Sequence, residues 1–466
     1  MSDLIAELQS LTKALEAGNY NAAPSTLVQG AALQTEDLSN VMQVVTFDES
    51  HIKLQKMVKV ESCKSTLAQF DRQLSYGIFG GSAQLEGAIG QEETSDFVRV
   101  VVPMAFYSHT RRVTIVANMV TTVDGTKAEE RAAADAAKKI AGDIEFDLFR
   151  GLADFSNAGV FDGNPLAVAP LPNMHGVDLQ VRQSDNQRAA RDLMFAEYGS
   201  DDTVVIAGGG PLTQDIVEDA SVRSALNFGD ADKLIVDPKV LSAYNKIVFG
   251  KEKIILAGSP QNSTGGDLRK QWVSGGTVDI EGSMFLRGKA KPAPARPTGP
   301  SAPTMGTPTG STDTNAVTAF LAGDVYSYKI TACNELGESP PSALASNSAL
   351  SNDGDKITLT CTPNSTTRYY NVYRTLESGA AGTEKFIGRV AANGSAAVTF
   401  TDLGNKIPGF VTGFLIEGDT MALKELAPYS RLKLAVTDLI QPEAHFRFCT
   451  LAVMQPRKNV LVDNLQ

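Results

Sequence analysis

The sequence predicts an α+β host domain that is interrupted by a smaller, all-β domain. Residues 289–315 read KAKPAPARPTGPSAPTMGTPTGSTDTN, hold six of the chain's 21 prolines and carry almost no large apolar side chain. Such a segment has too little apolar surface to offset the entropy that is lost on ordering. Strand-like runs follow it to about residue 405, and the α+β pattern then resumes. We therefore predict a Pro-rich linker over 289–315, an inserted β-sandwich over 316–408 and a return to the host over 409–466.

The composition is that of a globular protein that does not grip nucleic acid or lipid. The 466 residues include 20% charged and 42% hydrophobic residues, and the formal net charge is −11. An acidic surface neither neutralises phosphates nor docks on anionic lipid. No run of about 20 apolar residues occurs, and the beginning, MSDLIAELQSLTKALEAG, is not a secretory signal. We expect a chain that is made in the cytosol, stays there unless it leaves inside an assembly, and contacts no membrane.

The first 60 residues predict a short helix and an extended arm. Apolar residues recur at helical spacing over 2–17, and Gly18 and Pro24 end that helix. Val41–Phe47 and Ile52–Val60 are the strand candidates that follow.

Residues 61–122 predict a long, two-stranded hairpin. Five glycines lie between Gly77 and Gly90, and two β-rich runs follow at Phe97–Tyr107 and Arg111–Val120. An isolated hairpin is only marginally stable in water. We therefore expect this one to lie on another surface, in the same chain or in a neighbouring one.

Residues 123–184 predict the longest helix of the chain and a loop. Thr126 and Glu129 have the spacing of a capping box, apolar residues line one face as far as Leu148, and Gly151 supplies a stop. A helix over 127–150 spans about 36 Å, enough to support a whole domain. The loop predicted over 155–180 contains three prolines.

Residues 185–288 predict a second α/β unit, and three further strands follow the insertion. The expected elements are helices over 185–198, 212–225 and 239–248, strands over 203–207, 233–237, 254–257 and 277–286, and, after the insertion, strands over 414–416, 431–439 and 446–454.

No catalytic, cofactor or metal site emerges from the sequence. The four histidines, His51, His109, His175 and His445, lie far apart, and structural roles are favoured for them. The triple glycine 208–210 lacks the Lys-Ser/Thr of a phosphate-binding loop, so we interpret it as a turn between a strand and a helix.

The remaining polar candidates also favour structure over chemistry. Asp143 and Asp147 share a helix face and predict a solvated or intersubunit surface. The four cysteines, Cys63, Cys333, Cys361 and Cys449, show no paired spacing, so free thiols are favoured over zinc or disulfides.

The order of several segments resembles one family of shell proteins. These segments are KAEERAAADAAKKIAGDIEFDLFRG (127–151), FDG (161–163), HGVDL (175–179), the run from PLTQDIVEDASVRSALNF to KVLSAYNKIV (211–248) and the ending RLKLAVTDLI…HFRFCTLAVMQPRKNVLV (431–462). Together they are similar to the major capsid protein of tailed bacteriophages, which has the Hong Kong 97-like head fold. The likeness covers roughly 40–290 and 412–466.

This resemblance implies a role for each part of the chain. Residues 1–60 would form the N-terminal helix and arm, 61–122 the extended loop, 123–184 the spine helix and peripheral domain, 185–288 the axial domain, and 409–466 the return to both domains. Some heads of this family join subunits by Lys–Asn isopeptide bonds, but Lys59 and Lys64 have no identifiable partner, so we assign no crosslink.

The insertion has a likeness of its own. VYSYKITACNELGESPPSALAS (325–346) is similar to the Tyr-x-Tyr strand of immunoglobulin and fibronectin type III domains. In those domains the strand comes late, whereas here KITLTCT, YYNVYR, KFIGRV and AVTFTDLG follow it. We therefore expect a permuted or variant sandwich.

The function implied is structural and not enzymatic. The resemblance implies a virion subunit that assembles in the bacterial cytoplasm into pentamers and hexamers of an icosahedral shell, which then matures. Portal and scaffolding proteins would be partners, double-stranded DNA would be enclosed without sequence-specific binding, and the insertion would bind a host surface or glycan weakly. The alternatives are an encapsulin-like compartment shell and a cell-surface or secreted binding protein with a sandwich module.

Overall fold

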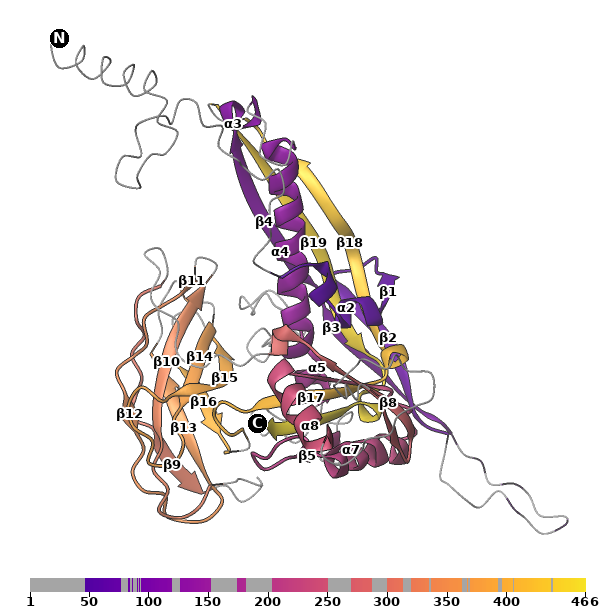
Figure 1. The fold of residues 1–466 in the computed structure, drawn as a ribbon, viewed down its shortest axis with the longest axis vertical. Helices are drawn as coiled ribbons and strands as arrows, with labels where there is room; N and C mark the ends of the chain where they lie inside the picture. Colours follow the sequence, from indigo (N-terminus) through magenta and orange to yellow (C-terminus); the bar gives the residue numbers. More distant parts are fainter. Residues whose placement is uncertain are drawn as a thin grey trace, which may run out of the picture.

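The computed structural model shows an elongated α+β body with a β-sandwich on one side (Figure 1). It describes residues 47–76, 83, 86, 90, 92, 94–119, 126–151, 174–181, 203–249, 270–286, 300–312, 320–334, 337–362, 367, 369–392, 396–404, 406–436 and 439–466. The helices predicted over 2–17 and 185–198, the strand over 254–257 and most of the Gly77–Gly90 segment lie outside these residues.

The distal part of the body is a long sheet with a helix lying along it. We call this part the arm, and it is distinct from the N-terminal arm predicted within residues 1–60. The sheet has the order β1-β18-β19-β4, formed by Lys59–Ser62, Met421–Lys433, Ile440–Val453 and Ala105–Thr114. Helix α4, Ala128–Arg150, runs beside β4 and β19 (Figure 1). Its 23 residues extend for about 35 Å, which agrees with the length predicted from the sequence.

The other part of the body is a mixed, six-stranded sheet. Its order is β5-β20-β17-β6-β8-β7, formed by Val204–Ile206, Val460–Leu465, Val411–Ile416, Lys233–Val236, Gly276–Gly282 and Lys270–Val273. Side chains of α7, Gln214–Leu226, and α8, Pro238–Phe249, share one core with this sheet. The end of α4 and the short α5, Val177–Val181, share a second core with its strands. The two cores hold the sheet between helices.

The insertion folds as two facing β-sheets. One sheet has the order β11-β10-β14-β15, with β12 also paired to β10, and the other has the order β16-β13-β9. The strands are β9 Thr309–Thr312, β10 Ser327–Asn334, β11 Gly337–Glu338, β12 Ala345–Ser346, β13 Asp355–Cys361, β14 Tyr369–Arg374, β15 Lys385–Ala391 and β16 Val398–Asp402. Ile330 and Val372 from one sheet meet Ile357 and Phe400 from the other in a single core. The Tyr-x-Tyr strand is β10, in the middle of its sheet.

The linker prediction over 289–315 is wrong for residues 300–312. Thr309–Thr312 pairs with β13, Met305 forms a bridge with Cys361, and Pro303 and Pro308 are buried. Proline is tolerated beside an edge strand because its missing N–H faces away from the ladder. The sandwich therefore begins before residue 316, inside the segment whose composition indicated a tether.

Two predictions near the hairpin need correction. Ile52–Val60 is not a strand, because residues 54–57 form the short helix α2 and β1 begins only at Lys59. Within the two-stranded hairpin predicted over 61–122, Leu67–Ser75 pairs with Asp96–Pro103, whereas residues 105–114 belong to another sheet. Met104 separates two strands, and β4 then continues without interruption from Ala105 through 108–110, paired with β19. Pairing with a strand more than 300 residues away overrides the local pattern.

The predicted capping box of the long helix is absent. Lys127 occupies the N-cap without a side-chain cap, and Glu129 turns instead to cationic side chains of β18. The predicted stop is confirmed, since α4 ends at Arg150 and Gly151 is its C-cap. A Cβ on Gly151 would lie 2.3 Å from the carbonyl oxygen of Met174, so only glycine fits there.

The cysteines and the described helices bear on two further expectations. All four cysteines are free, and three of them are buried. None of the helices that the structure describes combines the length and the apolar character that a membrane crossing requires.

Candidate functional site

The arm ends in a cluster of exposed apolar side chains, which we call the apolar tip. Its members come from α3, Ile115–Met119, from the end of β18 and from the segment between β18 and β19. The amide of Ile115 donates a 2.9 Å hydrogen bond to the carbonyl oxygen of Leu439, which joins α3 to that segment. The exposed fractions are 61% for Val116, 78% for Met119, 54% for Leu432, 39% for Leu434, 55% for Val436 and 64% for Leu439. Soluble monomers rarely expose so many large apolar side chains in one place, so the tip has the character of an interaction surface.

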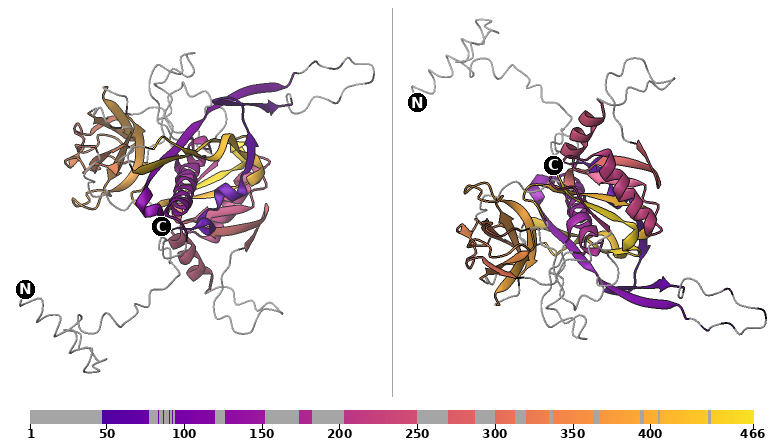
Figure 2. Two further views of the ribbon diagram at one scale, coloured as in Figure 1. Left: turned by 90° about the horizontal axis from the view of Figure 1, so that it is seen from above. Right: turned by 90° about the horizontal axis from the view of Figure 1, so that it is seen from below.

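A second exposed feature is the hairpin formed by β2, Leu67–Ser75, and β3, Asp96–Pro103. The strands pair in register from Leu67↔Pro103 to Ser75↔Asp96 and form a sheet of their own. The hairpin points away from the body on the side opposite the sandwich (Figures 1 and 2). Nine residues of strand reach about 30 Å.

The hairpin is attached to the body at its base, and its aromatic side chains are exposed towards its end. Val102 is fully buried, and the guanidinium of Arg72 donates to the carbonyl oxygens of Val453 and Met454 on the body. Further out, Phe97 is 66% exposed and Tyr76 is 89% exposed. A two-stranded ribbon with such aromatic side chains gains stability only when another surface covers it.

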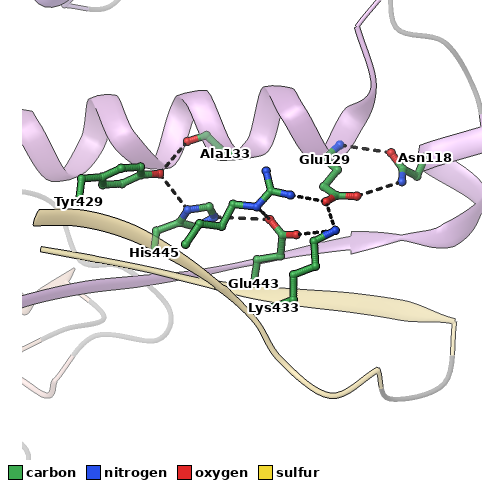
Figure 3. A network of polar contacts seen from close by, with 8 residues as sticks. Asn118, Glu129, Ala133, Tyr429, Lys433, Glu443 and His445 are labelled. Atoms are coloured by element: carbon green, nitrogen blue, oxygen red, sulfur yellow. Dashed lines mark hydrogen bonds and ion pairs between the residues drawn. The ribbon is translucent and has the colours of Figure 1, made fainter.

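An ionic cluster joins the start of α4 to the sheet of the arm (Figure 3). The carboxylate of Glu129 accepts hydrogen bonds from Arg431, Lys433 and Asn118. Arg431 also pairs with Glu443 on β19, with 3.1 Å between Nε and Oε2. Glu443 lies opposite Lys433 on β18 and opposite Arg111 on β4, so cations flank it on both sides.

Two histidines lie beside this cluster. His445 is fully buried, accepts or donates a 2.9 Å hydrogen bond between its Nδ1 and the Tyr429 hydroxyl, and pairs in register with His109 on β4. Burial, together with the nearby Arg431 and Arg111, lowers the pKa of His445. Burial and Lys139 lower the pKa of His109. Both rings therefore favour the neutral form, although the carboxylate of Glu443, 3.9 Å from Nε2 of His445, would offset part of the charge added on protonation.

Buried carboxylates secure the other end of the long helix. Glu145 is fully buried and accepts hydrogen bonds from the amides of Lys53, Leu54 and Gln55, at 2.7 to 2.9 Å, which caps α2. Burial raises the pKa of Glu145, whereas those three amides oppose the rise. Asp147 accepts a 2.8 Å hydrogen bond from the Tyr107 hydroxyl of β4. The α4 backbone is therefore tied to the N-terminal segment and to the sheet.

The sequence suggested part of this arrangement and missed the rest. Asp143 is exposed, but Asp147 is buried within the chain, so the prediction that the two form a solvated or intersubunit surface is wrong for Asp147. The role of Glu145 was not predicted, because its three partners lie about 90 residues earlier in the chain. The ionic cluster was missed, since its members come from four separate elements.

The described residues form no group of side chains with the arrangement of a catalytic or metal-binding site. None of their acidic, histidine and cysteine side chains gather in threes that could hold a metal ion. Gly208 and Gly209 have φ values of 63° and 83°, which the predicted strand-to-helix turn requires. What the structure brings together are surfaces, namely the apolar tip, the hairpin and the ionic cluster beneath the tip.

Comparison with known proteins returns shell proteins. No protein-family model matches this chain, and no curated protein matches it. Among solved structures, the chain is similar to the capsid of a native GTA particle, with 11% identity, a TM-score of 0.49 and coverage of 96% of this chain and 100% of that one. It is also similar to the capsid of the cyanophage P-SCSP1u, with 10% identity, a TM-score of 0.44 and coverage of 95% and 98%. A third similar structure is the SrpI encapsulin of Synechococcus elongatus PCC 7942, with 7% identity, a TM-score of 0.40 and coverage of 92% and 93%.

Proposed function

We propose that this chain is the major head subunit of a tailed phage, which builds an icosahedral shell from pentamers and hexamers of itself. The observation that carries the proposal is that the arm, which forms one end of the body, and the hairpin both end in exposed apolar side chains. A compact monomer gains nothing from such extensions, whereas a subunit in a shell uses them to bury area on its neighbours. Two of the segments that resemble the head proteins contribute to this arm, since 127–151 contains α4 and 431–462 contains β19.

The occupant of these surfaces would be further copies of the same chain. The hairpin and the apolar tip are different patches on different elements, so contacts between copies would be heterologous. Heterologous contacts close into rings when the rotation per subunit fits, as pentamers and hexamers require. The net charge of −11 would discourage packaged DNA from adhering to the wall and agrees with enclosure without sequence-specific binding.

Other partners and the role of the insertion follow from the same proposal. Portal and scaffolding proteins would join the shell during assembly in the bacterial cytoplasm. The sandwich would decorate the particle, where many weak contacts to a host surface or glycan add up through avidity. An encapsulin-like compartment is the alternative, since it would use the same surfaces to enclose a cargo protein.

Electron microscopy of the expressed chain, alone and with a scaffolding partner, tests the proposal. We expect closed shells from the complete chain. Deletion of residues 77–90 at the end of the hairpin should leave a folded, soluble subunit that forms none. Particles that hold DNA support the phage head, and particles that hold a cargo protein support the compartment. A chain that stays monomeric at high concentration with its partner present would refute both.

A further inference from the structure

We propose that the inserted sandwich is locked onto the end of helix α4, so that it moves with the body as one rigid unit and does not swing on a tether. The chain leaves the body at Leu286 and returns to it at 406–411. Contacts hold the returning connection, and another contact holds one sheet of the sandwich. We call these contacts the anchor.

The point at which the chain leaves the body is fixed by the last residue of α4. Leu286 is fully buried, and its carbonyl oxygen accepts a 2.7 Å hydrogen bond from Nη2 of Arg150. The outgoing chain therefore starts from a fixed point beside the C-terminal end of α4.

The returning connection is held from the body at two adjacent residues. The ammonium of Lys406 lies 3.1 Å from the carboxylate of Asp178 on α5. The amide of Ile407 donates a 2.8 Å hydrogen bond to the side chain of Asn464 on β20. Asn464 has a φ of 61°, a conformation that asparagine tolerates better than most residues, and its side chain is thereby directed to this bond.

The same connection is held from inside the sandwich. The carbonyl oxygen of Lys406 accepts a 2.7 Å hydrogen bond from Nη2 of Arg374. Arg374 is itself buried and pairs with Asp402, with 2.6 Å between Nη1 and Oδ2, and Asp402 also accepts from the Tyr328 hydroxyl at 3.0 Å. Lys406 is therefore fixed by its side chain to the body and by its backbone to the sandwich core.

A further contact joins a sheet of the sandwich directly to α4. The guanidinium of Arg389 on β15 lies 6.0 Å from the ring centre of Phe146 on α4. Arg389 is held in this position within its own sheet, because it stacks on Tyr369 at 4.2 Å and donates to the side chain of Asn371 at 3.1 Å. A side chain that is already ordered loses little entropy when it makes a further contact.

These contacts act together because they converge on one region of the body. Phe146 and Arg150 lie one turn apart on α4, and Asp178 lies on the helix that shares a core with them. A flexible tether leaves the two parts independent, whereas attachment through the returning connection and one sheet opposes relative rotation. Every copy of the sandwich would then face the same way on its subunit.

Distance measurements between spin labels test the anchor in the complete chain. Labels on Leu376→Cys in the sandwich and Val60→Cys in the body, in a Cys63→Ser background, should give one narrow distance distribution. The Arg389→Ala/Lys406→Ala variant removes two contacts without leaving a charge fully buried, and should broaden the distribution at least twofold. The Arg112→Ala/Lys239→Ala variant truncates the same residue types on the exposed surface of the body and should leave it narrow.

Each outcome decides the proposal independently of assembly. Dilution of labelled chain into an excess of unlabelled chain isolates the distance within one subunit, in a shell or free in solution. A broad distribution in the unsubstituted chain would overturn the anchor, and so would an unchanged narrow one in the Arg389→Ala/Lys406→Ala variant. Circular dichroism of that variant confirms that both parts remain folded, and the single Lys406→Ala variant repeats the test with the milder change.

Discussion

The sandwich and the arm are both built from long strands, but only the sandwich completes its own core. Tyr328, Ile330 and Leu359 are fully buried between its two sheets, and the buried carboxylate of Glu338 accepts hydrogen bonds from neighbouring strands. In the arm, α4 lies along the sheet, and β4 alternates between half-buried and exposed side chains almost to its end. The sandwich therefore buries its apolar side chains within a single copy, whereas the arm leaves side chains exposed that we propose a neighbouring copy covers.

The largest expected effect is on assembly, and it comes from the apolar tip. The Met119→Asp/Leu439→Asp variant places two charges where we propose that a second copy docks, and burial of an unpaired charge is very costly. We expect a folded subunit that forms no shells, measured by sedimentation velocity and electron microscopy.

A matched variant in the sandwich sharpens this contrast. Leu321 and Leu376 are exposed by 59% and 55%, close to the tip residues, but belong to the region that is complete by itself. The Leu321→Asp/Leu376→Asp variant should assemble normally. Equal loss of shells from both variants would contradict the distinction between the two regions.

The second effect is on stability, and it falls on the sandwich core. Arg374→Ala leaves the carboxylate of Asp402 buried without its cation. Breaking a buried pair in this way costs about 3–5 kcal/mol of unfolding free energy. Hydrogen exchange of the β10 and β14 amides in the complete chain measures this loss. Arg112→Ala, on the exposed face of β4, serves as the control and should change stability by less than about 0.5 kcal/mol. A loss below 1 kcal/mol at Arg374, on the scale of an exposed pair, would show that the pair is not the centre of that core.

The smallest effect is a pH dependence confined to the arm. The pKa values of His109 and His445 are lowered in the folded chain, so the unfolded chain binds protons more tightly at these sites. Stability contributed by the neutral rings is therefore complete above their ordinary pKa of about 6.5 and declines as the pH falls below it. Protection factors of the β4 and β19 amides, which correct each exchange rate for the pH dependence of intrinsic exchange, should fall between pH 7 and 5.5.

Substitution of the two histidines separates their contribution from that of the carboxylates. The His109→Gln/His445→Gln variant cannot gain these protons, so the protection factors of β4 and β19 should depend less on pH over this range. Protection factors in the sandwich strands should be unaffected in both proteins. A slope in the arm that survives the substitution would assign the pH dependence to other groups.

The sequence by itself determined the local elements whose pattern and partners lie close together. Helix α4 was predicted almost to the residue, because its apolar face and its stop at Gly151 are properties of consecutive residues. The strands of the sandwich were predicted for the same reason, since alternation such as that around Tyr328 requires no knowledge of the partner strand.

Only the tertiary structure decided what depends on distant partners. The continuity of β4 through 108–110 comes from β19, the cap of α2 comes from Glu145 on another helix, and the prolines of 300–312 are ordered because β13 offers them an edge. The physical reason is that hydrogen bonds and burial stabilise segments that meet in space, however far apart they lie in the sequence. The composition of a segment indicates only the entropy that this segment loses when it becomes ordered.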